Sequence, residues 1–147
     1  MFNIKVEREK LYGIVGIIHE VHKHLGPGLN ESCYQEAMEI QLKEAAIPYS
    51  REMSFHPTYK GVALQATFRV DFLCNSDIIV ECKAVPELNP NHRAQLFNYM
   101  RLFEKPCGIL VNYLPKYADI ERYLYDRETK NILGLDGRII KNFMDVK

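Results

Sequence analysis

This sequence of 147 residues lacks a net charge, a paired cysteine motif and any long apolar run, and each absence narrows what the protein can be. Nineteen basic and nineteen acidic side chains cancel, so no global positive field attracts nucleic acid, and such binding needs a local patch. No apolar stretch approaches the roughly 20 residues that span a bilayer, and no secretory signal is visible. We therefore expect a cytoplasmic protein with no membrane partner.

Cysteines are few and scattered along the chain. They are Cys33, Cys74, Cys82 and Cys107. No two of them form a Cys-x-x-Cys pair, which is poor spacing for zinc, and an iron–sulfur cluster would need four thiolates to converge. We expect free, buried or half-buried thiols in a reducing compartment.

The remaining composition is that of an ordinary globular protein, with 47% hydrophobic and 26% charged residues. One domain over residues 1–147 is long enough to bury a two-layer or three-layer core. Apolar periodicity predicts helices over residues 8–25, 31–46 and 90–103. Strands are expected over residues 48–56, 62–74, 78–83, 107–113 and 121–125, followed by a terminal hairpin and a loosely held tail.

Two of these strands, joined by the polar turn Asn75–Asp77, carry an unusual set of charges. Glu81 and Lys83 are two residues apart, so both point to the same side of the sheet. A two-residue turn would make Asp71 face away from Glu81. The three-residue loop instead places Asp71 opposite Glu81 on the same face.

Two carboxylates and an amine at the end of a buried strand are costly unless they are paired or coordinate a cation. Such a group can hold a hard divalent cation with an activated water nearby. The alternative is an ion pair between Lys83 and either Asp71 or Glu81 on an ordinary sheet.

Two helices offer further polar candidates. Glu31 lies in the first turn of the helix that Asn30 caps, where an acidic side chain also offsets the helix dipole without any catalytic role. Gln95 and Tyr99 are four residues apart on the helix over residues 90–103, so they share one stripe. This stripe either faces a polar site or is an ordinary boundary between core and solvent.

Three blocks of the sequence form a set. They are Gly28 to Tyr34, Asp71 followed by Glu81-Cys82-Lys83, and Gln95 to Tyr99. With them the chain resembles the PD-(D/E)XK nuclease superfamily and, within it, the small bacterial GxxExxY family. The resemblance covers about residues 11–120, and residues 121–147 fall outside it. One departure is that Val70, and not a proline, precedes Asp71.

The resemblance implies an α/β fold, a restriction-endonuclease-like three-layer domain whose central mixed sheet of four or five strands is flanked by helices. It implies that Glu31, Asp71 and Glu81 are ligands of Mg²⁺ or Mn²⁺. The backbone carbonyl of Cys82 is a further implied metal ligand.

The resemblance also implies roles for three other residues of the site. Lys83 positions or activates the attacking water and offsets charge on the phosphate. Gln95 and Tyr99 position the water, Lys83 or the substrate phosphate. The implied activity is that of a metal-dependent phosphodiesterase, a nuclease acting on DNA or RNA.

Two alternatives stay open beside this hypothesis. A catalytically silent binding or assembly module could keep the fold, and the zero net charge and small size favour it. A structural domain could use the acidic cluster only as an ion-pair network. A nuclease needs basic side chains around its cleft, and Lys60, Arg69 and Arg93 are the candidates. The oligomeric state is open, with a homodimer as one option.

Overall fold

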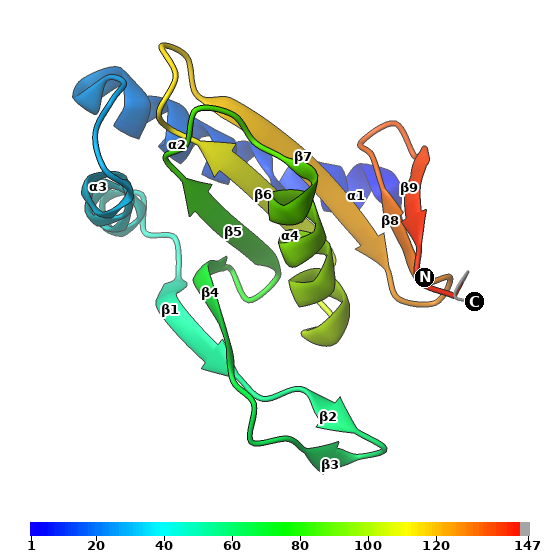
Figure 1. The fold of residues 1–147 in the computed structure, drawn as a ribbon. Coiled ribbons are helices and arrows are strands. Elements are labelled where there is room, and N and C mark those ends of the chain that lie inside the picture. The colour runs from blue at the N-terminus through cyan, green and yellow to red at the C-terminus, as the bar shows by residue number, and fades with distance from the viewer. Residues whose placement is uncertain (145–147) are drawn as a thin grey trace.

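A computed structural model of the chain describes residues 1–144 and has helices on both faces of a central sheet (Figure 1). The helices in this range are α1 (Ile4–Lys10), α2 (Tyr12–Leu25), α3 (Glu31–Glu44) and α4 (Pro90–Leu102). The strands are β1 (Tyr49–Phe55), β2 (Thr58–Tyr59), β3 (Val62–Ala63), β4 (Phe68–Cys74), β5 (Ile78–Lys83), β6 (Cys107–Asn112), β7 (Asp119–Asp126), β8 (Asn131–Leu133) and β9 (Ile139–Asn142). No helix in this range is long and apolar enough to span a bilayer.

The main sheet is mixed and has the strand order β1-β4-β5-β6-β7-β8-β9. Strands β5 and β6 are parallel, and the other neighbouring pairs are antiparallel. Helix α4 connects the two parallel strands across one face, as a parallel connection requires. Among the described residues the sheet thus has seven strands, and the expected four or five was too low because β8 and β9 extend it beyond β7.

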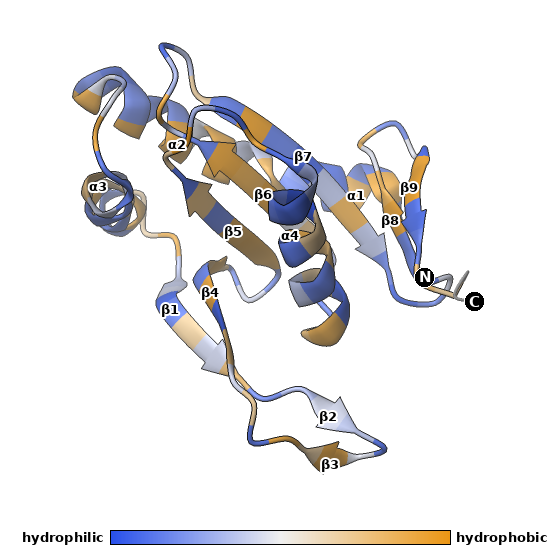
Figure 2. Cartoon of the chain, in the orientation of Figure 1, coloured by the Kyte–Doolittle hydropathy of each residue, from blue (hydrophilic) through white to orange (hydrophobic). Residues whose placement is uncertain are grey.

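Two apolar cores lie on the two faces of the sheet, which gives the three layers that the family resemblance implies. Helices α1, α2 and α3 cover one face, and α4 covers the other (Figure 1). The apolar colouring of β5 and β6 in Figure 2 agrees with their burial on both faces. Along β5, Ile78 and Val80 belong to the first core and Ile79 to the second. This alternation places Glu81 and Lys83 on the face that α4 covers.

The first predicted helix is divided in two and begins earlier than expected. The side chain of Asn3 caps α1 by accepting a hydrogen bond from the Val6 amide at 3.1 Å. The break falls at Leu11, whose amide donates to the Arg8 carbonyl at 3.2 Å in a tighter, 3₁₀-type turn. The Asn30 cap on α3 is present as predicted, with the Cys33 amide donating to its side chain at 3.1 Å.

The long strand expected from Val62 onward is interrupted. Residues Val62–Ala63 pair only with Thr58–Tyr59, in a small hairpin that projects from the body of the protein (Figure 1). The pairing of β1 with β4 stops at Phe55 and Phe68, so the ribbon leaves the sheet there and no core covers it. Val62 is consequently 66% exposed, and the strand expected over residues 62–74 is not one continuous element.

The C-terminal stretch forms the predicted hairpin and then a further strand. Strands β7 and β8 pair around a turn that begins after Asp126, and β9 adds to the edge of the sheet. Ile139–Asn142 is therefore a strand and not part of a loose tail. The last three positions of the expected tail, 145–147, lie outside the described residues.

Candidate active site

The loop Asn75–Asp77 fixes the register between β4 and β5. Phe72 pairs with Val80 in this register, so Asp71 lies opposite Glu81, as the odd loop length predicted. Each carboxylate accepts a hydrogen bond from the other strand's backbone. The Asp71 amide donates to Glu81 Oε2 at 2.9 Å, and the Cys82 amide donates to Asp71 Oδ2 at 2.8 Å.

These backbone hydrogen bonds hold two carboxylates side by side in a poorly solvated place. Glu81 is only 3% exposed. Burial raises the pKa of the Glu81 carboxyl well above its ordinary value, and the neighbouring charge of Asp71 adds to the shift. A buried carboxylate beside a second one is stabilised by positive charge, so the pair favours a cation in its vicinity.

Lys83 supplies one positive charge on this face, and α4 holds it in place. Its Nζ donates to Gln95 Oε1 at 3.2 Å. Within the described residues Lys83 forms no ion pair with Asp71 or Glu81, so the simple ion pair considered from the sequence is not formed. Tyr99, one turn further along α4, is buried, and burial together with the charge of Glu81 raises the pKa of its phenol.

Glu31 enters the site from the N-terminus of α3. Its Oε1 accepts a hydrogen bond from Gln35 Nε2 at 2.9 Å, and Gln35 Oε1 accepts one from Arg51 of β1 at 3.4 Å. Burial raises the pKa of the Glu31 carboxyl, and the charge of Asp71 raises it further. Gln35 was not singled out in the sequence, although its position four residues after Glu31 on a helix is a signal for such a contact.

One cavity of about 300 Å³ brings the candidate side chains together. Its lining residues are Glu31, Thr67, Phe68, Arg69, Asp71, Glu81, Lys83, Gln95 and Tyr99. All six side chains proposed from the sequence are among them, and they come from α3, β4, β5 and α4. Thr67 and Phe68 are additional wall residues that sequence reasoning missed, because their segment was read as part of a regular strand.

The three basic residues expected around the cleft lie in three different places. Arg69 lines the cavity. Arg93 instead donates two hydrogen bonds to Glu121 of β7, both at 2.7 Å, so its charge is already paired. Lys60 lies at the tip of the β2–β3 hairpin. Of these three candidates only Arg69 therefore lines the cavity, where it joins Lys83.

The block from Gly28 to Tyr34 fixes the position of Glu31 through contacts of its loop and of the Tyr34 side chain. The Tyr34 hydroxyl donates to the Gly26 carbonyl at 2.6 Å and accepts from the Leu29 amide at 3.1 Å, which pins the loop before α3. Gly28 has a φ of 85°, a conformation that favours glycine. Tyr34 also stacks on Tyr113 with ring centroids 4.6 Å apart. The start of α3, and with it Glu31, is thus fixed to the end of β6.

The donor chemistry of the cavity suits a hard divalent cation, because three carboxylates from separate elements line it. Their oxygens are not gathered into a finished coordination group, however. Among residues 1–144, no cluster of three or more His, Cys, Asp or Glu side chains has the arrangement that would hold a metal ion. The roles of Glu31 and of the Cys82 carbonyl as ligands therefore stay predictions.

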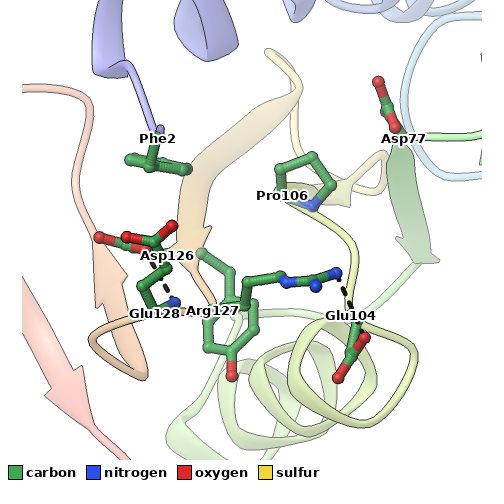
Figure 3. Close-up of a pocket in the computed structure, with 8 residues that line it drawn as sticks. Phe2, Asp77, Glu104, Pro106, Asp126, Arg127 and Glu128 are labelled. Atoms are coloured by element: carbon green, nitrogen blue, oxygen red, sulfur yellow. Dashed lines mark hydrogen bonds and ion pairs between the residues drawn. The ribbon is translucent and has the colours of Figure 1, made fainter.

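A second cavity, of about 320 Å³, contains none of the candidate residues (Figure 3). Three of its four acidic side chains, those of Asp77, Glu104 and Asp126, have a basic partner or a local hydrogen bond. Arg127 donates to Glu104 across its rim at 3.4 Å, and Asp77 pairs with Lys10 at 3.0 Å. The guanidinium of Arg127 is already paired with Glu104, and four of the eight lining residues are acidic, so this cavity does not compete with the site on β4 and β5.

Comparisons with known proteins agree with this geometry at the level of the family. No curated protein matches the sequence. Among solved structures, the one described as "Crystal structure of SSO0001" is similar with a TM-score of 0.47 and 22% identity, over 60% of this chain and 46% of that one. The chain thus spans less than half of that protein, and a likeness at this level carries no argument. A sequence model of the PD-(D/E)XK nuclease superfamily matches residues 8–123. The chain therefore belongs to the PD-(D/E)XK nuclease superfamily.

Proposed function

We propose that this protein is a metal-dependent phosphodiesterase, a nuclease that cleaves DNA or RNA. The observation that carries the proposal is the convergence of six chemically apt side chains from four elements on one cavity. They are Glu31, Asp71, Glu81, Lys83, Gln95 and Tyr99. All six also lie within residues 8–123, the stretch that the superfamily model matches.

We further propose that Asp71 and Glu81 hold Mg²⁺ or Mn²⁺, with Glu31 completing the acidic shell and the Cys82 carbonyl as an additional oxygen donor. Members of the superfamily typically use divalent metals. Such a cation lowers the pKa of a bound water and offsets the negative charge that develops on the phosphate. Burial raises the pKa values of Glu31 and Glu81 and the charge of Asp71 adds to both shifts, so a cation beside these carboxylates would favour their ionised forms.

Lys83 is the residue we assign to the reacting phosphate. Its hydrogen bond to Gln95 fixes the ammonium on the face that carries both carboxylates. From there it orients the attacking water and offsets charge on the phosphate. Arg69 on the cavity wall is suited to contact a neighbouring phosphate, and Tyr99 limits the space beside Gln95.

Membership of the GxxExxY family is the finer assignment we propose within the superfamily. Each fixed position of the motif has a distinct structural part. Gly28 takes a left-handed conformation, Glu31 lines the cavity and Tyr34 fastens the loop between them. The motif is therefore suited to position the Glu31 carboxylate at the cavity.

The second candidate function is a binding or assembly module that has kept the fold without catalysis. One observation favours it, namely that the described residues contain no ready three-ligand metal group. The pairing of Arg93 with Glu121 also removes one of the basic side chains expected at the cleft.

Cleavage assays separate the two candidates. Purified protein is tested on single- and double-stranded DNA and RNA with Mg²⁺ and with Mn²⁺, beside the variants Asp71→Ala and Lys83→Ala. Glu36→Gln is the matched control, because Glu36 lies on α3 like Glu31 but is exposed to solvent. The small diester bis(p-nitrophenyl) phosphate is included as a substrate that needs only the cavity.

The nuclease proposal predicts cleavage by wild type and Glu36→Gln, and none by Asp71→Ala. Lys83→Ala is expected to keep metal binding, since it removes a positive charge, and to lose turnover by a factor of about 10² or more. If wild type cleaves no substrate and binds no divalent metal, the silent module is the correct interpretation. Cleavage that persists in Asp71→Ala would indicate a contaminating nuclease.

A further inference from the structure

The β2–β3 hairpin starts at the wall of the candidate active site. Thr67, Phe68 and Arg69 line the cavity, and residues 56–67 run from this wall out to the hairpin tip and back. We call residues 56–67 the arm. Figure 1 shows the arm projecting away from the sheet and helices. A long polymer bound in the cavity would therefore lie next to Thr67, which is part of the arm.

The base of the arm is firmly attached to the body. Phe55 packs on Phe103 with ring centroids 4.5 Å apart, and on Phe68 at 5.8 Å. Within the arm, the Leu64 amide donates to the Pro57 carbonyl at 2.9 Å. The arm is thus held at a defined place beside the cavity, while its tip makes no contribution to either core.

The tip exposes a ring and an ammonium together. Tyr59 and Val62 pair across the hairpin and so share one face, and they are 62% and 66% exposed. The Lys60 ammonium lies 5.5 Å from the centre of the Tyr59 ring. Figure 2 shows β3 in the apolar colour. Nothing in either core requires this surface, so its composition calls for an external partner.

The charge of the arm suits a polyanion. Residues 53–70 contain no Asp or Glu, although the whole chain has 19 of them. The same stretch carries the basic residues Lys60 and Arg69 as well as His56. A basic, acid-free ribbon leading into a phosphodiesterase cavity is electrostatically complementary to a nucleic acid backbone.

The turn at the tip places a cation where the backbone disfavours it. Lys60 has a φ of 50° and Gly61 a φ of 80°, as in a type I′ hairpin turn. The first of these positions usually carries Asn, Asp or Gly, because other side chains are strained there. Strained positions cluster at functional sites, which is consistent with a use for the ammonium of Lys60.

We propose that the arm binds an unpaired stretch of nucleic acid next to the cleaved phosphodiester, with a base stacked on Tyr59 and a phosphate near Lys60. An exposed aromatic ring beside a cation is the combination that single-strand binding proteins use, with bases stacked on the ring and the backbone held along positive charge. A second copy of the chain is the less suitable partner, since a few tip side chains bury far less than the roughly 1,200 Å² of a stable interface. The inference rests on the proposed nuclease function.

Binding measured without metal tests the arm independently of catalysis. A fluorescent oligothymidylate and a DNA duplex, each of about 20 nucleotides or base pairs, are titrated with protein in EDTA and followed by anisotropy. The variants are Tyr59→Ser and Lys60→Gln. The matched control is Tyr117→Ser, because Tyr117 is 76% exposed and has the Lys116 ammonium 5.5 Å from its ring, yet does not line the cavity.

Tyr59→Ser is expected to weaken binding of the oligothymidylate by about 5- to 100-fold, the range of a lost base–aromatic stack. Its effect on the duplex should stay below about twofold, and Tyr117→Ser should change neither. Lys60→Gln should weaken binding and reduce the slope of log K against log salt by about 0.7, the value for one phosphate contact on a single strand.

Three results would overturn the inference. These are an unchanged affinity in both arm variants, an equal loss on the single strand and the duplex, and a wild-type dimer that Tyr59→Ser converts to monomer in light scattering. The outcomes also separate this inference from the proposed function. Binding that depends on Tyr59, without any cleavage, would support the role of the arm and refute the nuclease function. Cleavage of bis(p-nitrophenyl) phosphate and polynucleotides, with binding that does not depend on Tyr59, would support the nuclease function and refute the role of the arm.

Discussion

The carboxylate of Glu81 lies almost fully buried beside that of Asp71, with 3% of the residue exposed. The two accept backbone hydrogen bonds, but the ammonium of Lys83 is bonded to Gln95 and not to either of them. Buried pairs of carboxylates in a functional site usually lower the free energy of unfolding, and interactions elsewhere in the fold compensate for this. The acidic pair is therefore expected to reduce stability when no cation is bound.

Glu81→Gln should raise the free energy of unfolding by about 1 kcal/mol at pH 7 in metal-free buffer. Glutamine keeps an oxygen for the Asp71 amide and removes the charge. A carboxyl whose folded pKa is raised destabilises the fold above that pKa and has no effect below the unfolded pKa, so the gain should vanish as the pH falls to about 4. Urea unfolding at several pH values measures it, with Glu36→Gln as the unchanged control. A loss of stability at neutral pH would contradict the account.

The sequence allowed part of this site to be predicted at the level of single residues. Asp71, Glu81 and Lys83 could be placed on one face because strand side chains alternate and the loop between the strands has three residues. The spacing of Glu31 and Gln35 is a local signal for their contact, but the bond from Arg51 on β1 to Gln35 on α3 could not be predicted. That contact is set by tertiary packing and leaves no local pattern.

Among the elements, α3 depends on the loop that precedes it. The hydroxyl of Tyr34 bonds both the Gly26 carbonyl and the Leu29 amide, and these two bonds fix where the helix starts. Tyr34→Phe should therefore lower the free energy of unfolding by about 1–2 kcal/mol and weaken the placement of Glu31. Tyr49→Phe, which loses one hydroxyl bond to Glu39, is the control and should have the smaller effect in urea unfolding. Equal effects would mean that the loop is not held by this hydroxyl.

Helix α4 is tied to the sheet by Arg93, which donates two hydrogen bonds to Glu121 on β7. The bonds from Arg93 lower the pKa of the Glu121 carboxyl. A lowered folded pKa adds stability that is present above the unfolded pKa and lost as the pH falls through the folded one. Glu121→Gln should thus cost about 1 kcal/mol at pH 7, a modest value because the guanidinium is partly exposed, and less at acidic pH.

The control for this ion pair is Glu104→Gln. Its carboxylate meets Arg127 at 3.4 Å, with 58% and 69% of the two side chains exposed. Pairs of that kind contribute little, so thermal unfolding of Glu104→Gln should match wild type at every pH. A cost for Glu121→Gln that does not decline on acidification would show that packing, and not charge, holds α4 in place.

The arm is the element that sequence patterns described least well. The sequence predicted one strand over residues 62–74 with alternate side chains on an apolar face, but only Val62–Ala63 and Phe68–Cys74 are strands. Alternation does not tell which element covers that face. Because the pairing of β1 with β4 ends at Phe55, the apolar face of the hairpin is exposed and not buried.

At the scale of the whole molecule, three layers could be predicted and the width of the sheet could not. The buried run in β5 and the helical stripes indicated a sheet covered on both faces. Strands β8 and β9 have three and four residues, which is too short for alternation to identify them. The family match also ends at residue 123, before both of them.

The central claim is that the cavity between β4, β5, α3 and α4 holds a catalytic divalent cation, and calorimetric titration with Mn²⁺ tests it most directly. Wild type and Glu36→Gln are expected to bind Mn²⁺ alike. Asp71→Ala is expected to lose the heat of binding, because each carboxylate contributes direct charge to a hard cation. Equal heats in wild type and Asp71→Ala, or no binding by wild type at millimolar Mn²⁺, would contradict it.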